Sequence, residues 1–352
     1  MSLWVDKHRP RYLENVDYHI ELSQRLKSLT TSDFPHILVY GPSGAGKKTR
    51  VVATLKELFG PAVEKIKIDS RVFTTPSNKK LEFTIVSSIY HMEITPSDMG
   101  SFDRVVIQDL LKEVAQTQQV DLQAKQKFKV VVINEADSLT RDAQAALRRT
   151  MEKYSPNLRL ILLANTTSNI IAPIKSRTLL IRVAAPTNDE ISTVLAAVSK
   201  RERVPLPSNE ADYQTVFNNI AFASNRNLRK ALLILEAMYA QNGSLNTSTP
   251  IPPPDWEIVI TKLAADIASD RSVRRIVQAR AILYELISHC IPPNIILKTL
   301  SFSLLTNVQP LVKPDIIDLA ATYDHRLRLG SKSIYHLEAF VAKVMTAIEK
   351  KS

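Results

Sequence analysis

The chain has 352 residues, more than a single domain usually contains, and this length favours two or three domains. Apolar residues make up 45% of the chain and charged residues 23%, a composition that supports a sizeable core and excludes global disorder. The formal net charge of +11 suits a polyanionic partner, although a solvated basic face without a partner would have the same charge.

The first half of the chain alternates short apolar runs with helical patterns. Residues 81–85 alternate between apolar and polar, which is typical of an edge strand or a hairpin insertion. The apolar runs read as short buried strands separated by helices, and this order predicts a parallel sheet built from strand–helix–strand units. The predicted buried strands are 36–40, 65–69, 129–133, 160–163 and 179–183, and the predicted helices are 49–59 and 103–119.

Strand signals end near residue 186, and helical periodicity follows over 189–200 and 213–240. A polar and proline-rich stretch at 241–254 is typical of a linker. Beyond it, apolar residues again recur on one helical face up to Ile348. We therefore expect an α/β domain followed by all-α parts, with boundaries at 1–184, 185–243 and 244–352.

Glycine is scarce, with 7 residues where about 25 would be usual, yet three of them fall within 41–46. They belong to the stretch Gly41-Pro42-Ser43-Gly44-Ala45-Gly46-Lys47-Lys48-Thr49, which follows a predicted strand and precedes a predicted helix. In a phosphate-binding loop of this kind, glycines let backbone N–H groups point at an anion, and the lysine contacts the β- and γ-phosphates. The sequence therefore predicts a nucleotide site at this loop.

Two positions that normally hold magnesium are altered. The residue after the loop lysine is Lys48 instead of Ser or Thr, and the acidic residue expected after the strand 129–133 is Asn134. Magnesium needs oxygen ligands, which an ammonium group does not offer. Thr49 is turned by about 100° on the helix and cannot substitute without a local shift of register. Glu135, which would polarise an attacking water, remains, so we expect a site that holds nucleotide but hydrolyses it poorly, with magnesium weak or absent and no protein metal site.

Four further segments resemble those of the AAA+ ATPases, and specifically the small subunits of the eukaryotic clamp loader, replication factor C. Within that family, the Lys47-Lys48-Thr49 loop, the Asn134-Glu135 strand end and the insertion ending at 90–98 are similar to the subunit type farthest from the large subunit in the five-membered arc. The resemblance covers the whole chain and implies an AAA+ domain, a helical lid and a C-terminal collar. The matching segments are 3–10 (with His8 where the family has Tyr), 143–152, 174–178 (with Thr178 where the family has Cys) and 225–232.

The resemblance also implies roles for individual residues. Arg177 would be the arginine finger that acts on the ATP of the neighbouring subunit, where a guanidinium stabilises charge on the transferring phosphate. Glu135 would be a vestigial catalytic residue. Asn165 and Arg229 would be the two sensors of the phosphates. The expected nucleotide contacts are Val5, Arg9, Val16, Asp17, Gly41, Pro42, Ser43, Gly44, Ala45, Gly46, Lys47, Lys48, Thr49, Asn165 and Arg229.

The family further implies a heteropentamer with four other subunits, alternative large subunits, the sliding clamp PCNA and primer–template DNA as partners, ADP as the favoured nucleotide and the nucleus as location. For DNA, the helix starting at Arg141 and carrying Arg148 and Arg149 is the candidate, because a helix start with nearby cations suits a phosphate contact. Arg148 and Arg149 could instead bridge subunits or brace the sheet. A charged start, a single cysteine and no long apolar run lead us to expect an intracellular protein that is not embedded in a membrane.

Three other functions stay open at this point. The first is a competent ATPase that recruits Thr49 to the metal. The second is a small-molecule kinase of the phosphate-loop type, which would leave Ser176-Arg177 unexplained. The third is a scaffold with an empty nucleotide site.

Overall fold

The computed structural model describes residues 2–74, 80–116, 128–205, 207, 210–247, 249–330 and 332–351. It divides into two compact units, Met1–Ile251 and Pro252–Ser352. The division falls within the linker that the polar and proline-rich stretch 241–254 predicts. The three domain boundaries expected from the sequence remain predictions.

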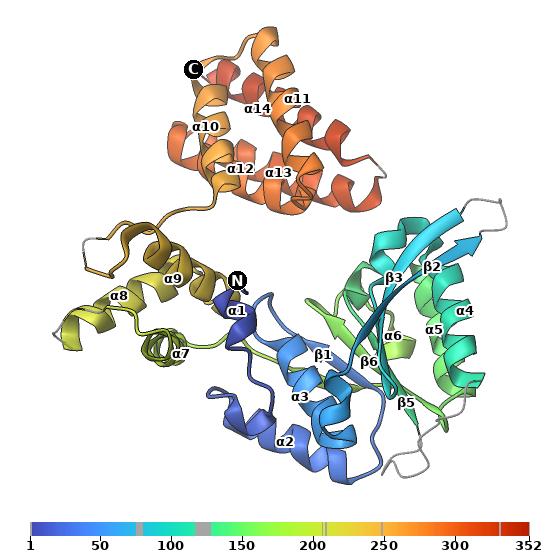
Figure 1. Ribbon diagram of the computed structural model, residues 1–352. Coiled ribbons are helices and arrows are strands. Elements are labelled where there is room, and N and C mark those ends of the chain that lie inside the picture. Colours follow the sequence, from blue (N-terminus) through green and yellow to red (C-terminus); the bar gives the residue numbers. More distant parts are fainter. Residues whose placement is uncertain are drawn as a thin grey trace. The chain divides into compact units, whose positions relative to one another are not determined.

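The first unit is built on a seven-stranded sheet with the order β2-β3-β4-β5-β6-β1-β7 (Figure 1). Neighbours from β4 to β7 run parallel, as predicted, whereas β2 and β3 form an antiparallel hairpin that adds to the edge at β4. The strands are β1 Ile37–Tyr40, β2 Lys67–Thr74, β3 Lys80–Ser87, β4 His91–Ile94, β5 Lys129–Ile133, β6 Leu158–Ala164 and β7 Leu179–Arg182.

The hairpin corrects one prediction and confirms another. The prediction of a buried strand at 65–69 is wrong, because Ile68 is 74% exposed and β2 lies at the edge of the described sheet. The hairpin reading of residues 81–85 is confirmed by β3. The short strand β4 was not predicted separately, because its four residues were assigned to the insertion.

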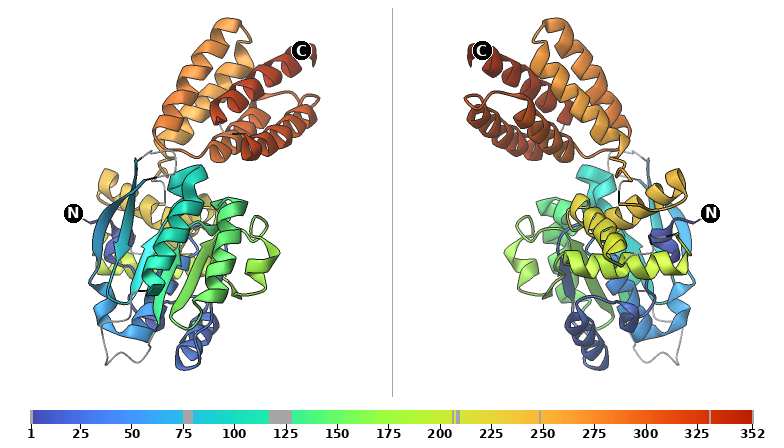
Figure 2. Two further views of the ribbon diagram at one scale, coloured as in Figure 1. Left: turned by 90° about the vertical axis from the view of Figure 1, so that its right-hand side faces the viewer. Right: turned by 90° about the vertical axis from the view of Figure 1, so that its left-hand side faces the viewer.

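Helices cover both faces of the sheet, as expected for parallel strands that are apolar on both sides. Val130 and Val132 of β5 belong to the core under α2 (Ile20–Thr31) and α3 (Lys47–Phe59). Val131 and Ile133 face the other way and pack with the helices seen side by side in Figure 2, α4 (Asp103–Gln116) and α5 (Arg141–Lys153). The last residues of the predicted helix 103–119 lie outside the described residues.

Three helices complete the first unit beyond the sheet: α7 (Asn188–Arg201), α8 (Glu210–Ala223) and α9 (Leu228–Asn242). The pattern at 213–240 predicts a continuous helical stretch, but the chain breaks between α8 and α9, where Asn225 and Arg226 have positive φ angles of 53° and 62°. The shorter helical segments are α1 Trp4–Lys7, η1 Leu13–Asn15, η2 Pro61–Glu64, η3 Pro96–Phe102, η4 Ala136–Ser138 and α6 Ala172–Lys175.

The second unit is an all-α bundle, drawn in orange to red in Figure 2. Its helices share one apolar core that runs from Ile260 to Ile348. In the described part of the chain, no helix combines the length and the apolar character that crossing a membrane requires. The helices are α10 Asp255–Ser269, α11 Val273–Ser288, α12 Pro293–Asn307, α13 Lys313–Leu329 and α14 Ser333–Lys351.

Candidate nucleotide-binding site

The predicted phosphate loop lies at the carboxyl edge of the parallel sheet. It connects β1 to α3, and β1 pairs with β6 so that Tyr40 lies opposite Ala164. Asn134 and Asn165 follow the neighbouring strands β5 and β6 and therefore reach the same edge. In open parallel sheets this edge is where ligands bind.

Lys47 begins α3 and lies folded over the loop. Its Nζ atom donates hydrogen bonds to the carbonyl oxygens of Gly41 at 2.6 Å and Pro42 at 3.0 Å, and to Oδ1 of Asn165 at 2.9 Å. Burial lowers the pKa of Lys47, and the nearby Arg229 lowers it further while Asp137 opposes the shift. Two loop carbonyls and Asn165 thus contact the same lysine, and Arg229 of α9 is close enough to affect the pKa of that lysine.

Asp137 fixes the backbone that carries Asn165. Its Oδ2 atom accepts hydrogen bonds from the N–H groups of Asn165 at 3.2 Å and Thr166 at 3.4 Å, while Oδ1 is buried without a hydrogen-bond partner. In the sequence, Asp137 is recognisable only as part of an acidic cluster. No sequence pattern predicts its contact with Asn165, 28 residues away.

The side chains at the two altered magnesium positions, Lys48 and Asn134, contact other residues of the chain. Nζ of Lys48 lies 2.6 Å from Oε2 of Glu93, and the amide of Asn134 donates to Oγ1 of Thr95 at 3.3 Å. Among the described residues, no group of three or more His, Cys, Asp or Glu side chains is arranged to hold a metal ion. An ammonium group offers magnesium no oxygen ligand, and Asn134 offers an uncharged amide oxygen in place of a carboxylate.

Glu135 also has a partner within the chain. Its Oε2 atom accepts a hydrogen bond from Oγ of Ser97 at 3.1 Å. Glu135 has a φ angle of 50°, in the left-handed region that non-glycine residues seldom adopt. A non-glycine residue in this conformation often marks a functional site.

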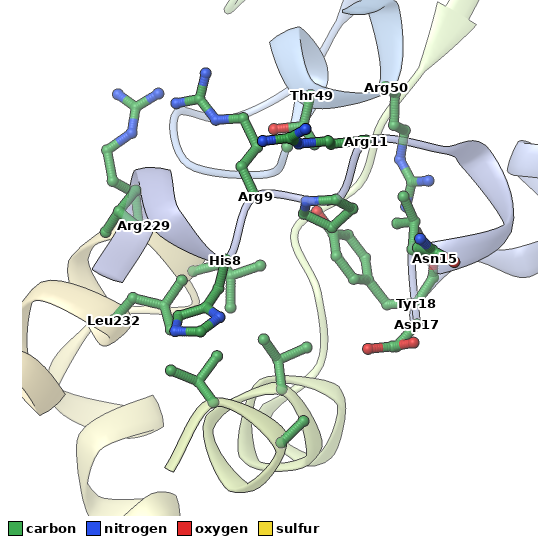
Figure 3. Close-up of a pocket in the computed structure, with 18 of the residues that line it drawn as sticks. His8, Arg9, Arg11, Asn15, Asp17, Tyr18, Thr49, Arg50, Arg229 and Leu232 are labelled. Atoms are coloured by element: carbon green, nitrogen blue, oxygen red, sulfur yellow. Dashed lines mark hydrogen bonds between the residues drawn. The ribbon is translucent and has the colours of Figure 1, made fainter. Parts of the chain in front are cut away.

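A cavity of about 510 Å³ opens beside the loop, lined by the N-terminal segment, α3, α7 and α9 (Figure 3). Figure 3 shows Arg9, Arg11 and Arg229 at the end of the cavity where Thr49 lies. Six cationic side chains line the cavity against two carboxylates, so it suits an anion. The predicted residues in its lining are Val5, Arg9, Val16, Asp17, Gly44, Gly46, Thr49 and Arg229.

The remaining predicted nucleotide contacts do not line this cavity. They lie on the loop or at the adjoining sheet edge, where Lys47 contacts some of them. These residues are Gly41, Pro42, Ser43, Ala45, Lys47, Lys48 and Asn165.

The N-terminal segment is tied to the helices beyond the sheet. The ring of Trp4 packs against that of Tyr239 of α9, with centroids 5.4 Å apart. The backbone N–H of Trp4 donates a hydrogen bond to Oε2 of Glu236 at 3.1 Å. Nζ of Lys7 lies 2.6 Å from Glu202, which also contacts the ring of His8. The segment that carries Val5 and Arg9 is thereby held against α7 and α9.

Arg50 and Tyr18 form a cavity wall that the sequence does not predict. The fully buried guanidinium of Arg50 donates to the carbonyl of Tyr18 at 2.7 Å and to Oγ of Ser23 at 2.8 Å, and it lies 4.6 Å from the centre of the Tyr18 ring. The Tyr18 hydroxyl donates to the carbonyl of Ala45 at 3.1 Å, and burial raises its pKa. These contacts link α3 to the phosphate loop through Tyr18, at positions where no sequence motif indicates them.

α9 contacts the loop directly at Gly44. A Cβ atom at this position would lie 1.8 Å from Oδ1 of Asn227, and Gly44 has a φ angle of 74°. Asn227 caps α9, since its side chain accepts a hydrogen bond from the N–H of Lys230 at 3.1 Å. The loop and the start of α9 are therefore in van der Waals contact, which only glycine allows here.

Arg177, the predicted finger, lies outside the cavity lining. Its Nε and Nη2 atoms lie 2.8 and 2.7 Å from Oε1 of Glu152, and Nη1 donates to the carbonyl of Pro173 at 2.9 Å. A third of its side chain remains exposed. The resemblance assigns no role to Glu152.

The candidate DNA-contacting residues Arg141, Arg148 and Arg149 are all exposed on α5. Arg141 and Arg148 are seven residues apart and share one face of the helix. Arg148 also contacts Glu152 at 3.4 Å.

Comparisons with known proteins cover nearly the whole chain. Replication factor C subunit 5 of Neurospora crassa is 65% identical over 350 residues, covering 99% of this chain and 98% of that protein. Subunit 5 of Saccharomyces cerevisiae is 54% identical over 99% of this chain and 100% of that protein. Replication factor C subunit 3 of Homo sapiens is 51% identical over 99% of this chain and 97% of that protein.

Family models and a solved structure agree with the predicted fold. A solved RuvB structure from Thermotoga maritima aligns at 14% identity with a TM-score of 0.50, covering 72% of this chain and 78% of that one, a likeness of fold alone. The predicted P-loop sheet with a helical lid and a C-terminal helical part is confirmed. The matching models are "DNA polymerase III, delta subunit" (19–187), "RCF1/5-like, AAA+ ATPase lid domain" (193–240) and "Replication factor C subunit 3, C-terminal domain" (256–352).

Proposed function

The chain belongs to the family of replication factor C subunits 5 and 3, and from that membership we propose that it holds nucleotide in a poorly hydrolysing site and donates Arg177 to its neighbour. The family has a role in clamp loading during DNA replication, as part of a multi-subunit complex. We propose the finer role of one subunit in a heteropentamer that loads PCNA onto primer–template DNA in replication and repair, in the nucleus. The four other subunits, and alternative large subunits, are its expected partners.

The observation that carries the proposal is the asymmetry between the binding and the catalytic parts of the site. The binding part is intact, because Lys47, Asn165 and Arg229 surround a loop beside a cationic cavity. The catalytic part is altered, because Lys48 and Asn134 stand at the magnesium positions. A site of this kind favours bound ADP over turnover of ATP.

Arg177 supports the second half of the proposal. It is a part-exposed guanidinium that does not line the cavity of its own chain, which supports a role on a partner's nucleotide rather than on its own. A planar cation suits the charge that develops on a transferring phosphate, and such fingers raise hydrolysis rates by about 10³–10⁵.

DNA contact is proposed for the exposed arginines of α5. Arg141 and Arg148 share a face that could follow a phosphate backbone, and Arg149 lies beside it. Sequence-independent binding of this kind weakens steeply with salt. The salt slope of DNA binding by the complex should therefore become shallower in an Arg141→Ala/Arg148→Ala variant.

A competent ATPase site in this chain is the main alternative. The ATPase rate of the purified chain with magnesium separates the two, because the proposal expects almost no turnover and the alternative expects steady hydrolysis. Denaturing the purified complex and quantifying the released nucleotide would distinguish a nucleotide-holding subunit from a scaffold with an empty site.

A further inference from the structure

Lys48 and Glu93 form an ion pair at the position where phosphate-loop proteins keep their magnesium-binding hydroxyl. The Nζ–Oε2 distance is 2.6 Å, and the Glu93 side chain is only 7% exposed whereas that of Lys48 is 44% exposed. A buried carboxylate left without its cation is strongly destabilising, so Glu93 anchors Lys48. The ammonium group of Lys48 is therefore held by Glu93, while part of the lysine side chain remains exposed to solvent.

The sheet register explains why these residues meet. β4 runs parallel to β5 with Glu93 opposite Val132, and Val132 belongs to the core that packs against α3. Glu93 therefore faces α3, whose first turn carries Lys48. Thr95 and Asn134 directly follow these two strands, and the amide of Asn134 donates a hydrogen bond to the hydroxyl of Thr95.

We propose that Lys48, anchored by Glu93, is a built-in cation that replaces magnesium, so that the site takes a metal-free nucleoside diphosphate. The inference rests on the proposed nucleotide site. An ammonium group has three N–H donors, so Lys48 retains donors for phosphate oxygens while it contacts Glu93. Lys48 itself offers magnesium no ligand, and its positive charge repels the ion.

The contact differs from an ordinary surface ion pair, which contributes little. One partner is buried, and the pair lies at the first turn of the helix that begins in the phosphate loop. His91 on the same strand is also buried, and its pKa is lowered mainly by burial, while Glu93 raises it and Lys48 lowers it.

The test measures binding of a fluorescent ADP analogue to the purified full chain, with either excess magnesium or excess EDTA. We expect wild-type affinities in the two conditions to agree within about twofold. Lys48→Met keeps an unbranched side chain of nearly the same length but removes the charge, and should weaken binding in EDTA by about tenfold or more. Lys48→Thr restores the magnesium-binding hydroxyl and should make binding depend on magnesium.

Lys48→Arg and Lys65→Met are the matched controls. The first keeps the charge and should keep metal-independent binding, and the second removes an exposed lysine outside the site and should bind like wild type. Thermal melting of each variant checks folding, and Lys48→Arg preserves the test if Lys48→Met does not fold.

Two outcomes would overturn the inference while leaving the nucleotide site in place. One is wild-type binding that requires magnesium, and the other is Lys48→Met binding that equals wild type in EDTA. If the wild-type chain bound no nucleotide in either condition, the proposed function itself would fail, and this inference would fail with it.

Discussion

Arg177 and Glu152 form a two-point contact in which Nε and Nη2 of the guanidinium approach the same carboxylate oxygen, Oε1, at 2.8 and 2.7 Å. Nη1 is held separately by the carbonyl of Pro173 and the hydroxyl of Ser176. Glu152 lies near the end of α5, and Arg177 follows α6. The orientation of the proposed finger is therefore set by its own chain before any neighbour is present.

Glu152→Gln should lower the ATPase rate of the assembled complex several-fold. The substitution removes the charge that orients Arg177, and small misplacements of a catalytic group are costly. Stability should change by less than about 1 kcal/mol, since both side chains are partly exposed. Steady-state kinetics with DNA and clamp present would give kcat and KM, and the loss should fall on kcat.

Glu21→Gln, at an exposed glutamate on α2, is the control and should have wild-type kinetics. If Glu152→Gln left kcat unchanged while Arg177→Ala lowered it, Glu152 would have no positioning role.

Gly44→Ala should destabilise the first unit more than Gly60→Ala. Both glycines have positive φ angles, 74° and 80°, so both substitutions strain the backbone by about 1–2 kcal/mol. Only at Gly44 would the new Cβ overlap another group, Oδ1 of Asn227, whereas nothing lies within 4 Å at Gly60. Thermal melting of the two variants isolates the contact between the loop and α9, and equal melting temperatures would contradict it.

Gln144→Leu should lower the free energy of unfolding by about 2–4 kcal/mol, because it leaves three backbone groups without their hydrogen-bond partner. The buried amide donates to the carbonyls of Leu139 and Asn169 and accepts from the N–H of Ile171. It thereby joins α5 to the loop between β6 and α6. Urea unfolding would measure the loss, with Gln24→Leu as an exposed control. Equal free energies of unfolding for the two variants would contradict a stabilising role of the Gln144 hydrogen bonds.

Much of the site was predictable, because its motifs are local. The glycines and Lys47 adjoin in sequence, and Asn134 and Asn165 each follow an apolar run. The contacts that decide the chemistry are not local. Lys48 meets Glu93 only because β4 pairs with β5, and β4 is too short to stand out from the insertion before it.

The fold was also largely predictable from local patterns, and the wrong predictions concern features that depend on non-local packing or on backbone conformation. Apolar runs identified the buried parallel strands, but an apolar run at 65–69 gave no sign that Ile68 would face solvent at a sheet edge. A helical period over 213–240 could not reveal the break at Asn225 and Arg226, which depends on two residues adopting positive φ.

Nucleotide binding should be accompanied by proton uptake at alkaline pH. Burial lowers the pKa of Lys47 below its ordinary value of 10.5 in the nucleotide-free site, and bound phosphates would raise it again. The bound state therefore holds more protons, and affinity should fall as pH rises through the lowered pKa. Calorimetry of ADP binding in two buffers of different ionisation enthalpy would detect the uptake, whereas heats that do not depend on the buffer would contradict it.

We propose that this subunit contributes to hydrolysis through Arg177 and not through its own phosphate loop. The most direct measurement compares the DNA- and clamp-stimulated ATPase rates of complexes assembled with Arg177→Ala or with Lys47→Ala. We expect a large loss of the ATPase rate for Arg177→Ala and little change for Lys47→Ala. A large loss for Lys47→Ala together with an unchanged rate for Arg177→Ala would contradict it.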